Sequence, residues 1–131
     1  MQLSHLAHVM RSQGNYPQAR TLYKEGLRLS VELKDKRGTA WLLEGLAAIA
    51  AAQGRPEQAV RLMGASEASR EVLGVAALGP LGPRDRSDHE QTVARARALL
   101  DASAFGALWS EGRAMTLEQA VQYSLEEDPE P

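Results

Sequence analysis

The sequence predicts an all-α fold, and three observations support this prediction. The 131 residues include 21 Ala and 18 Leu, two of the strongest helix formers. Val, Ile and Thr, which favour strands, total only 12. A pattern typical of helix, turn and helix near the N-terminus also returns 40 residues later. Such a repeat indicates helix pairs stacked in an array.

The first helix pair is predicted from the N-terminal residues. Apolar side chains recur there with the spacing of one helical face, at Leu3, Leu6, Ala7 and Met10. Gly14 suits the left-handed backbone that ends a helix, so we expect the first helix to span residues 3–12. Pro17 is tolerated in the first turn of the next helix, which we expect to reach about Leu33.

The second pair repeats the first. The heptapeptide QGNYPQA at 13–19 returns as QGRPEQA at 53–59, after a charged turn at 34–38. The upstream apolar face returns as Leu43, Leu46, Ala47 and Ala50. A phosphate-binding loop is excluded because no strand precedes either glycine and no Gly-Lys-Ser/Thr follows. The residues expected to pack the helix pairs are Gly14, Tyr16, Ala19, Tyr23, Gly54, Pro56, Ala59 and Met63.

The third unit departs from the repeat. Residues 75–83 contain two Gly and two Pro and predict a loop. The next helix starts either at a capping box opened by Ser87 or just after Pro83, and should run to Leu100. Asp101 is expected to cap a helix ending near Gly112, and a second capping box at 116–119 opens a last helix to Leu125.

These elements predict one helical domain over residues 1–125. Its parts are repeat one at 1–34, repeat two at 35–74, the loop at 75–83 and a C-terminal cap at 84–125. A final unit that breaks the pattern is what a solenoid needs to cover its last apolar face. The acidic, Pro-rich residues 126–131 are expected to be disordered.

The spacing of residues 14–23, Gly-x-Tyr-x-x-Ala-x-x-x-Tyr, resembles the tetratricopeptide repeat. The second unit, from Gly54 to Met63, matches with Pro56 in place of the aromatic residue. The resemblance implies a right-handed solenoid of antiparallel helix pairs. The period of 40 departs from the usual 34 of that family, which fits a longer second helix.

Two stretches extend the resemblance over residues 3–125. GTAWLLEGLAAIAAAQGRPEQAVRLMGASEASREVLG and ALWSEGRAMTLEQAVQYSL look like the C-terminal helical region of large bacterial regulators. Those proteins, signalling ATPases and LuxR-type transcriptional regulators, join an ATPase module to such an array. The resemblance therefore implies that this chain is a C-terminal part of a larger bacterial regulator.

Composition excludes several classes of function. The absence of Cys removes disulfides, thiolate zinc sites and Cys nucleophiles. A net charge of −2 gives no basic excess for nucleic acid, and no apolar run is long enough to span a membrane. We expect a cytoplasmic protein without a cofactor.

The sequence also lacks a pattern typical of an active site. His5 and His8 could share a metal, but no carboxylate or Cys nearby completes the site. His89-Glu90 resembles the start of a zinc-protease motif, but Val93 stands where the second His is required. No Ser lies in Gly-x-Ser-x-Gly. We therefore expect no metal site and no enzymatic activity.

A binding surface is predicted on the concave side of the array. Trp and Arg are frequent anchors of protein interfaces, although Trp41 could equally pack against a neighbouring helix. Glu44 should repel a carboxylate, so we expect this face not to bind acidic C-terminal peptides. The candidate residues for partner binding are Ser4, His8, Arg11, Trp41, Glu44 and Ala48.

We therefore predict a scaffold that binds a protein or peptide, or an ATPase module of its own parent chain. A sensor of peptides or small ligands that gates an attached ATPase is the alternative, and a purely structural end of a longer array is a weaker one. The outer side of the first helix has no predicted cover, so we expect it to drive self-association.

Overall fold

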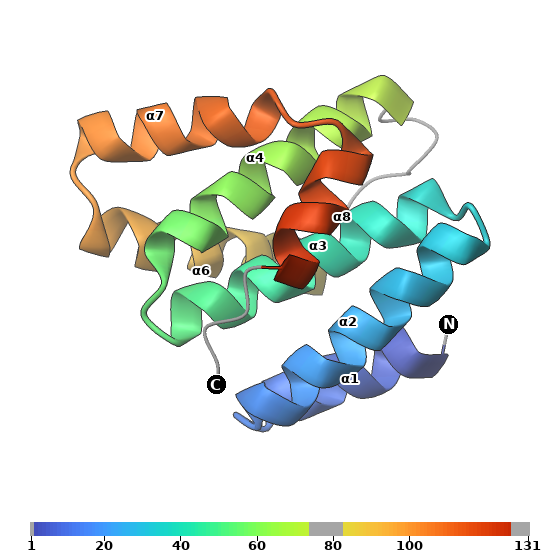
Figure 1. Ribbon diagram of the computed structural model, residues 1–131. Helices are drawn as coiled ribbons and strands as arrows, with labels where there is room; N and C mark the ends of the chain where they lie inside the picture. Colours follow the sequence, from blue (N-terminus) through green and yellow to red (C-terminus); the bar gives the residue numbers. More distant parts are fainter. Residues whose placement is uncertain (1, 74–82, 127–131) are drawn as a thin grey trace.

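The computed structural model describes residues 2–73 and 83–126, with the side chains of 6–72 and 89–126. All regular structure in these residues is helical, which confirms the all-α prediction. Figure 1 shows the helices packed around the pair α3 and α4. They are α1 (Gln2–Ser12), α2 (Tyr16–Glu32), α3 (Lys36–Ala52), α4 (Pro56–Leu73), α6 (Pro83–Leu99), α7 (Ala102–Arg113) and α8 (Leu117–Glu126).

The helix pairs α1–α2 and α3–α4 are closed by the same turn. Gly14 and Gly54 have φ angles of 81° and 78°, in the left-handed region that the sequence predicts for them. The following amide N–H groups, of Asn15 and Arg55, donate to carbonyls five residues earlier, at 2.9 and 2.8 Å. These bonds satisfy carbonyl groups that the end of a helix leaves without partners.

The turn between the two pairs differs from the expected charged turn at 34–38. α2 ends at Glu32 and α3 begins at Lys36, so only three residues connect them. Lys34 takes the left-handed position with φ 57°, although it is not a glycine. Asp35 caps α3 by accepting a 3.0 Å hydrogen bond from the Gly38 amide. The cap places Gly38 inside the first turn of α3.

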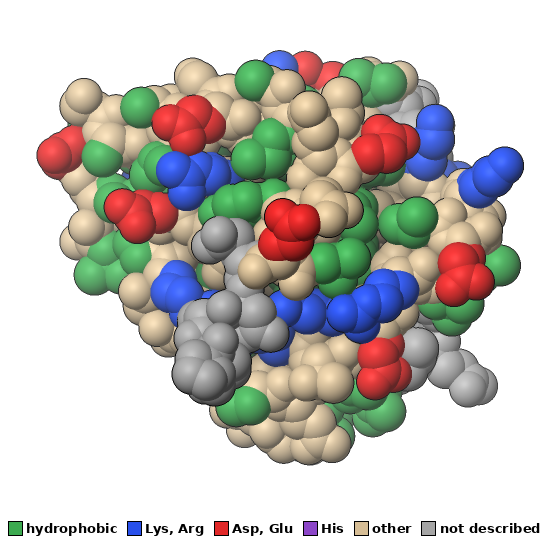
Figure 2. Space-filling model, in the orientation of Figure 1, with side chains coloured by type: hydrophobic (Ala, Val, Ile, Leu, Met, Phe, Trp, Pro, Cys, Tyr) green, Lys and Arg blue, Asp and Glu red, His purple; other side chains and the backbone are tan. Residues whose placement is uncertain are grey.

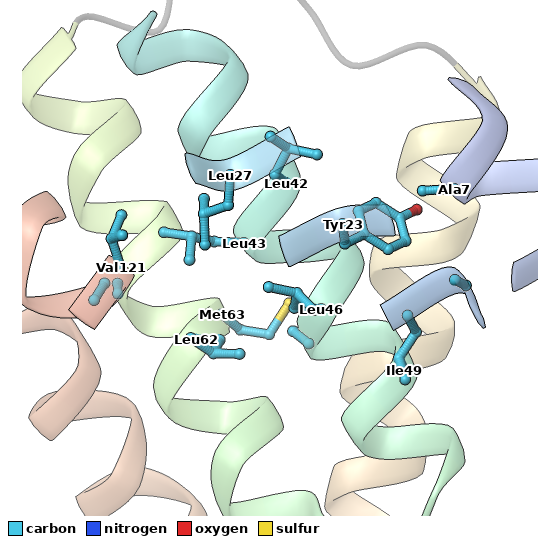
Figure 3. Packing of buried hydrophobic residues seen from close by; sticks show 14 residues of the cluster. Ala7, Tyr23, Leu27, Leu42, Leu43, Leu46, Ile49, Leu62, Met63 and Val121 are labelled. Carbon is cyan, nitrogen blue, oxygen red and sulfur yellow. The ribbon is translucent and has the colours of Figure 1, made fainter. Parts of the chain in front are cut away.

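The two pairs are joined by a buried aromatic contact. Tyr23 of α2 is fully buried, and its ring lies directly on Gly45 of α3. A Cβ atom at position 45 would lie 2.3 Å from Tyr23 Cε1, so only glycine lets the ring approach this closely. Figure 3 shows Tyr23 within a core that includes Leu27, Leu43 and Met63. This contact fixes the stacking of the pairs.

The C-terminal helices begin and end close to the expected residues. α6 begins at Pro83, the earlier of the two predicted starts, so Ser87 lies inside the helix instead of capping it. The Asp101 carboxylate accepts from the Ala104 amide at 2.7 Å, which confirms the predicted cap of α7. The predicted loop lies outside the described residues except for Pro83.

The last helix also opens as predicted. The Thr116 hydroxyl accepts from the Gln119 amide, and the Gln119 side chain accepts from the Thr116 amide. These reciprocal bonds form the capping box expected at 116–119. α8 includes Glu126, which the sequence assigns to the tail, and residues 127–131 lie outside the described residues.

The three C-terminal helices enclose the second pair. α7 packs along α4, while α6 and α8 each contact both α3 and α4. Figure 1 shows α8 in front of the α3–α4 pair and α6 behind it. α7 approaches α4 very closely, because Gly64 and Gly112 lie at the crossing. Both open faces of the second pair are therefore in contact with this C-terminal region.

Candidate functional site

The side chains of three predicted binding residues meet between α1 and α3. His8, Arg11 and Trp41 are each half-buried. The Arg11 guanidinium lies 2.9 Å from His8 Nδ1, and its Nε donates to the Tyr23 hydroxyl at 3.2 Å. The Trp41 ring lies 6.4 Å from the His8 ring and 6.1 Å from the Tyr23 ring, between centroids. We call His8, Arg11 and Trp41 the inner patch.

Glu44 lies deeper and is held by two other helices. Its Oε2 lies 2.7 Å from Arg70 Nη2 and accepts a hydrogen bond from the Ser66 hydroxyl at 2.9 Å, both on α4. Its Oε1 lies 3.7 Å from His89 Nδ1 on α6, the distance of an ion pair rather than of a hydrogen bond. The carboxylate therefore joins three helices.

The other two predicted binding residues are not part of this arrangement. Ala48 is buried, with 7 % of its surface exposed, so it offers little area to a partner. The Ser4 side chain lies outside the described part of the chain.

Sequence reasoning missed the residues that surround Glu44. Ser66 and Arg70 are ordinary polar residues of α4, and His89 and Thr92 belong to a helix whose position no local pattern reveals. Arg11, Trp41, Glu44, Arg70, His89 and Thr92 line one cavity of about 30 Å³, together with Tyr23, Gly45 and Met63. This volume has room for one or two water molecules and is too small for a substrate.

Electrostatic interactions stabilise the charged forms of Glu44 and His89. Burial by itself would raise the pKa of Glu44, but His89, Arg70 and Ser66 together outweigh it and hold the pKa below 4.5. The Glu44 carboxylate raises the pKa of His89 above 6.5, against the opposing effects of burial and of Arg70. Glu67 of α4 adds a smaller attraction to the imidazolium. These interactions therefore favour a charged His89 beside a charged Glu44.

These shifts predict that the protein is most stable at mildly acidic pH. The raised pKa of His89 contributes stability that is complete below pH 6.5 and is lost as the pH rises through the folded-state value. The lowered pKa of Glu44 contributes stability above pH 4.5 that is lost on further acidification. His89 is partly exposed, so its contribution to stability is small. We expect the free energy of unfolding to fall by at most about 1 kcal/mol between pH 5.5 and pH 8.5.

Urea unfolding at pH 5.5 and pH 8.5 measures this difference, and His89→Gln should abolish it. An equal pH dependence in wild type and His89→Gln would contradict the assignment to His89.

A larger groove lies between the C-terminal end of α4 and the α7–α8 turn. It has a volume of about 320 Å³, at the lower end of the range of ligand sites. Val72 is 87 % exposed at its edge, and Met115 and Leu117 add apolar surface from the α7–α8 turn. Lys36 and Glu118 bring charges of opposite sign to the groove. Arg113 also lines it but is held by Glu67 and Glu71, at 2.6 and 2.7 Å.

The predicted packing residues fall into two groups. Ala19, Tyr23, Ala59 and Met63 are buried in the contacts between helices. Tyr16 and Pro56 are half-buried at the starts of α2 and α4, and Gly14 and Gly54 are exposed in the turns. The two groups correspond to positions inside the stack and positions that end or begin a helix.

The residues that the structure describes contain neither a metal-binding group nor a membrane-spanning helix. Within residues 2–73 and 83–126, no group of three or more His, Asp or Glu side chains could hold a metal ion. In the same residues, no helix combines the length and the hydropathy needed to cross a bilayer.

A family model described as tetratricopeptide repeat matches residues 1–71. These residues cover α1, α2, α3 and most of α4, which are the helices that the sequence groups into two repeats. No curated protein and no solved structure gives a significant match.

Proposed function

The chain belongs to the tetratricopeptide repeat family, and from this premise we propose that it binds a partner protein and catalyses no reaction. Repeats of this family generally mediate interactions between proteins. The match over both helix pairs is the observation that carries the proposal. The cavity beside Glu44 is too small for a substrate, which agrees with binding of a partner on the surface of the protein.

The inner patch is the surface that we propose for the partner. Trp41 and Arg11 are of the residue types most frequent at the energetic centres of interfaces. Buried Tyr23 accepts a hydrogen bond from Arg11 and lies beside the Trp41 ring, so these two side chains have little conformational freedom to lose on binding. His8 extends the patch along α1. This rigid, amphipathic surface favours a protein or peptide over a small solute.

Photo-crosslinking from the inner patch tests the proposal. A photoreactive amino acid at position 8 should give one discrete protein adduct in the cells that produce this chain. Adding Trp41→Ala should remove that adduct. The same probe at Ser103, an exposed position of α7, is the control and should give none. No adduct at position 8, or equal adducts at both positions, would contradict a partner at this surface.

We infer further that this module is the C-terminal part of a larger bacterial signalling ATPase or LuxR-type transcriptional regulator, located in the cytoplasm. The support is the resemblance of its repeat and C-terminal stretches to such regions. An ATPase module of the same parent chain is then the nearest partner. The reading frame upstream of Met1 tests this, since it should encode that module.

A sensor of small ligands or peptides is the second candidate, and the 320 Å³ groove favours it. The groove combines apolar side chains with Lys36 and Glu118, as sites for small polar ligands do. A ligand there would contact α4 and the α7–α8 turn together. A rise in melting temperature with a small molecule, lost in Leu117→Asp, would support the sensor over the scaffold.

We also infer self-association through α1. Leu6 is 44 % exposed on this helix, which contacts α2 and, less extensively, α3. A second copy packed on this side would bury the exposed apolar surface.

A further inference from the structure

Two side chains of opposite charge line the groove between α4 and the α7–α8 turn. Lys36 is the first residue of α3, and Glu118 lies in the first turn of α8. Both side chains are exposed, and neither makes an ion pair with another side chain in the part of the chain that the structure describes. Figure 2 shows acidic and basic side chains near each other at the upper right of the view, beside the α2–α3 turn.

Arg113 also lines the groove, but its charge is already compensated. Its guanidinium nitrogens lie 2.6 Å from a carboxylate oxygen of Glu67 and 2.7 Å from one of Glu71, both on α4. A ligand therefore gains little from Arg113, because two carboxylates of the protein already hold it. The charges that a ligand in this groove can compensate are those of Lys36 and Glu118.

Most of the remaining wall of the groove is apolar. Val72 is 87 % exposed at the end of α4, and Met115 and Leu117 are half-buried in and after the α7–α8 turn. Ala68 and Ala114 add small apolar side chains. This surface favours an apolar group on the ligand, because contact between them removes apolar area from water. A volume of about 320 Å³ limits the ligand to a small molecule.

We propose that the groove binds a small zwitterion with an apolar side chain, such as an apolar amino acid or a dipeptide with free ends. Its carboxylate pairs with Lys36, its ammonium group pairs with Glu118, and its side chain packs against Val72 and Leu117. A ligand with a single charge leaves the opposite charge of the groove uncompensated. The inference rests on the sensor function proposed for this groove and names its class of ligand, and it is independent of the inner patch.

An NMR titration of the full-length chain with leucyl-leucine tests the proposal, and free leucine is titrated in the same way. The amide signals of Val72, Met115 and Leu117 should shift with a dissociation constant on the order of 1 mM or below, and the indole signal of Trp41 should not shift. N-acetyl-leucyl-leucine lacks the ammonium group, and leucyl-leucine amide lacks the carboxylate. Each should bind roughly fivefold more weakly than leucyl-leucine, as expected for the loss of one partly exposed ion pair.

Two variants assign each end of the ligand to one side chain of the groove. Lys36→Gln should bind leucyl-leucine and its amide equally, because the contact to the carboxylate is gone. Glu118→Gln should bind leucyl-leucine and its acetylated form equally, for the corresponding reason. Lys34→Gln is the matched control, because Lys34 is exposed in the same turn but does not line the groove, and it should bind like the wild type.

The uncharged compound N-acetyl-leucyl-leucine amide separates this inference from the sensor function itself. If it shifts the groove signals as strongly as leucyl-leucine does, the groove binds small apolar molecules but does not select a zwitterion, and only this inference fails. If neither leucyl-leucine nor free leucine shifts these signals, the inference is overturned. The sensor function fails separately, if no small molecule raises the melting temperature.

Discussion

Gly112→Leu is expected to destabilise the protein by about 3 kcal/mol or more, because the helices α4 and α7 would have to separate. A Cβ atom at Gly112 would lie 2.1 Å from the carbonyl oxygen of Arg61, and backbone atoms cannot rotate away as a side chain can. Gly64 faces α7 in the same way, since its Cβ would lie 2.5 Å from the Trp109 carbonyl oxygen. The crossing therefore depends on glycine in both helices.

Urea unfolding measures this effect, with Gly106→Leu as the matched control. Gly106 lies in the same helix, and a Cβ atom there meets nothing within 4 Å. Leucine at position 106 should be neutral or should stabilise α7 by up to about 1 kcal/mol through its higher helix propensity. A loss below about 1 kcal/mol in Gly112→Leu would contradict the close crossing.

Tyr23→Ala is expected to cost about 3–5 kcal/mol, the range for removing a large aromatic side chain from a core. Tyr23 is fully buried and fills the space that Gly45 leaves between the two helix pairs. Its hydroxyl also accepts the hydrogen bond from Arg11, and its ring lies beside Trp41. The substitution should therefore loosen the inner patch and shift the fluorescence of Trp41 in the protein that remains folded.

Tyr23→Phe separates the two contributions of this side chain. It keeps the ring and removes only the hydroxyl, so we expect a loss of about 0.5–1.5 kcal/mol. Urea midpoints of the two variants give the comparison. If Tyr23→Phe were as destabilising as Tyr23→Ala, the hydrogen bond to Arg11, and not the packing on Gly45, would hold the pairs together.

Much of the candidate site followed from the repeat pattern. The shift that aligns Leu3 with Leu43 also places Trp41 and Glu44 on the inner side of the second pair, and the structure puts Arg11, Trp41 and Glu44 around one cavity. The pattern did not predict that Glu44 is engaged by Arg70 and His89. His89 lies 45 positions further along the chain, in a segment that does not follow the repeat.

Most helix starts and ends could be predicted from the sequence, because each is set by residues close to it in the chain. A glycine with positive φ, a proline in a first turn and an Asp or Thr cap each act within a few residues, as at Gly54, Asp101 and Thr116. Lys34 is the exception, since a lysine in the left-handed region leaves no signal in the sequence.

The placement of α6 and α8 on the two sides of the second pair has a different physical origin. It depends on contacts between residues far apart in the chain, such as Ala120 and Val121 of α8 with the core around Leu43. Local patterns say which face of a helix is apolar but not which other helix covers it. Composition and periodicity therefore specify a helical repeat protein, while long-range packing specifies which charges are brought together, and so forms the cluster of Glu44, Ser66, Arg70 and His89.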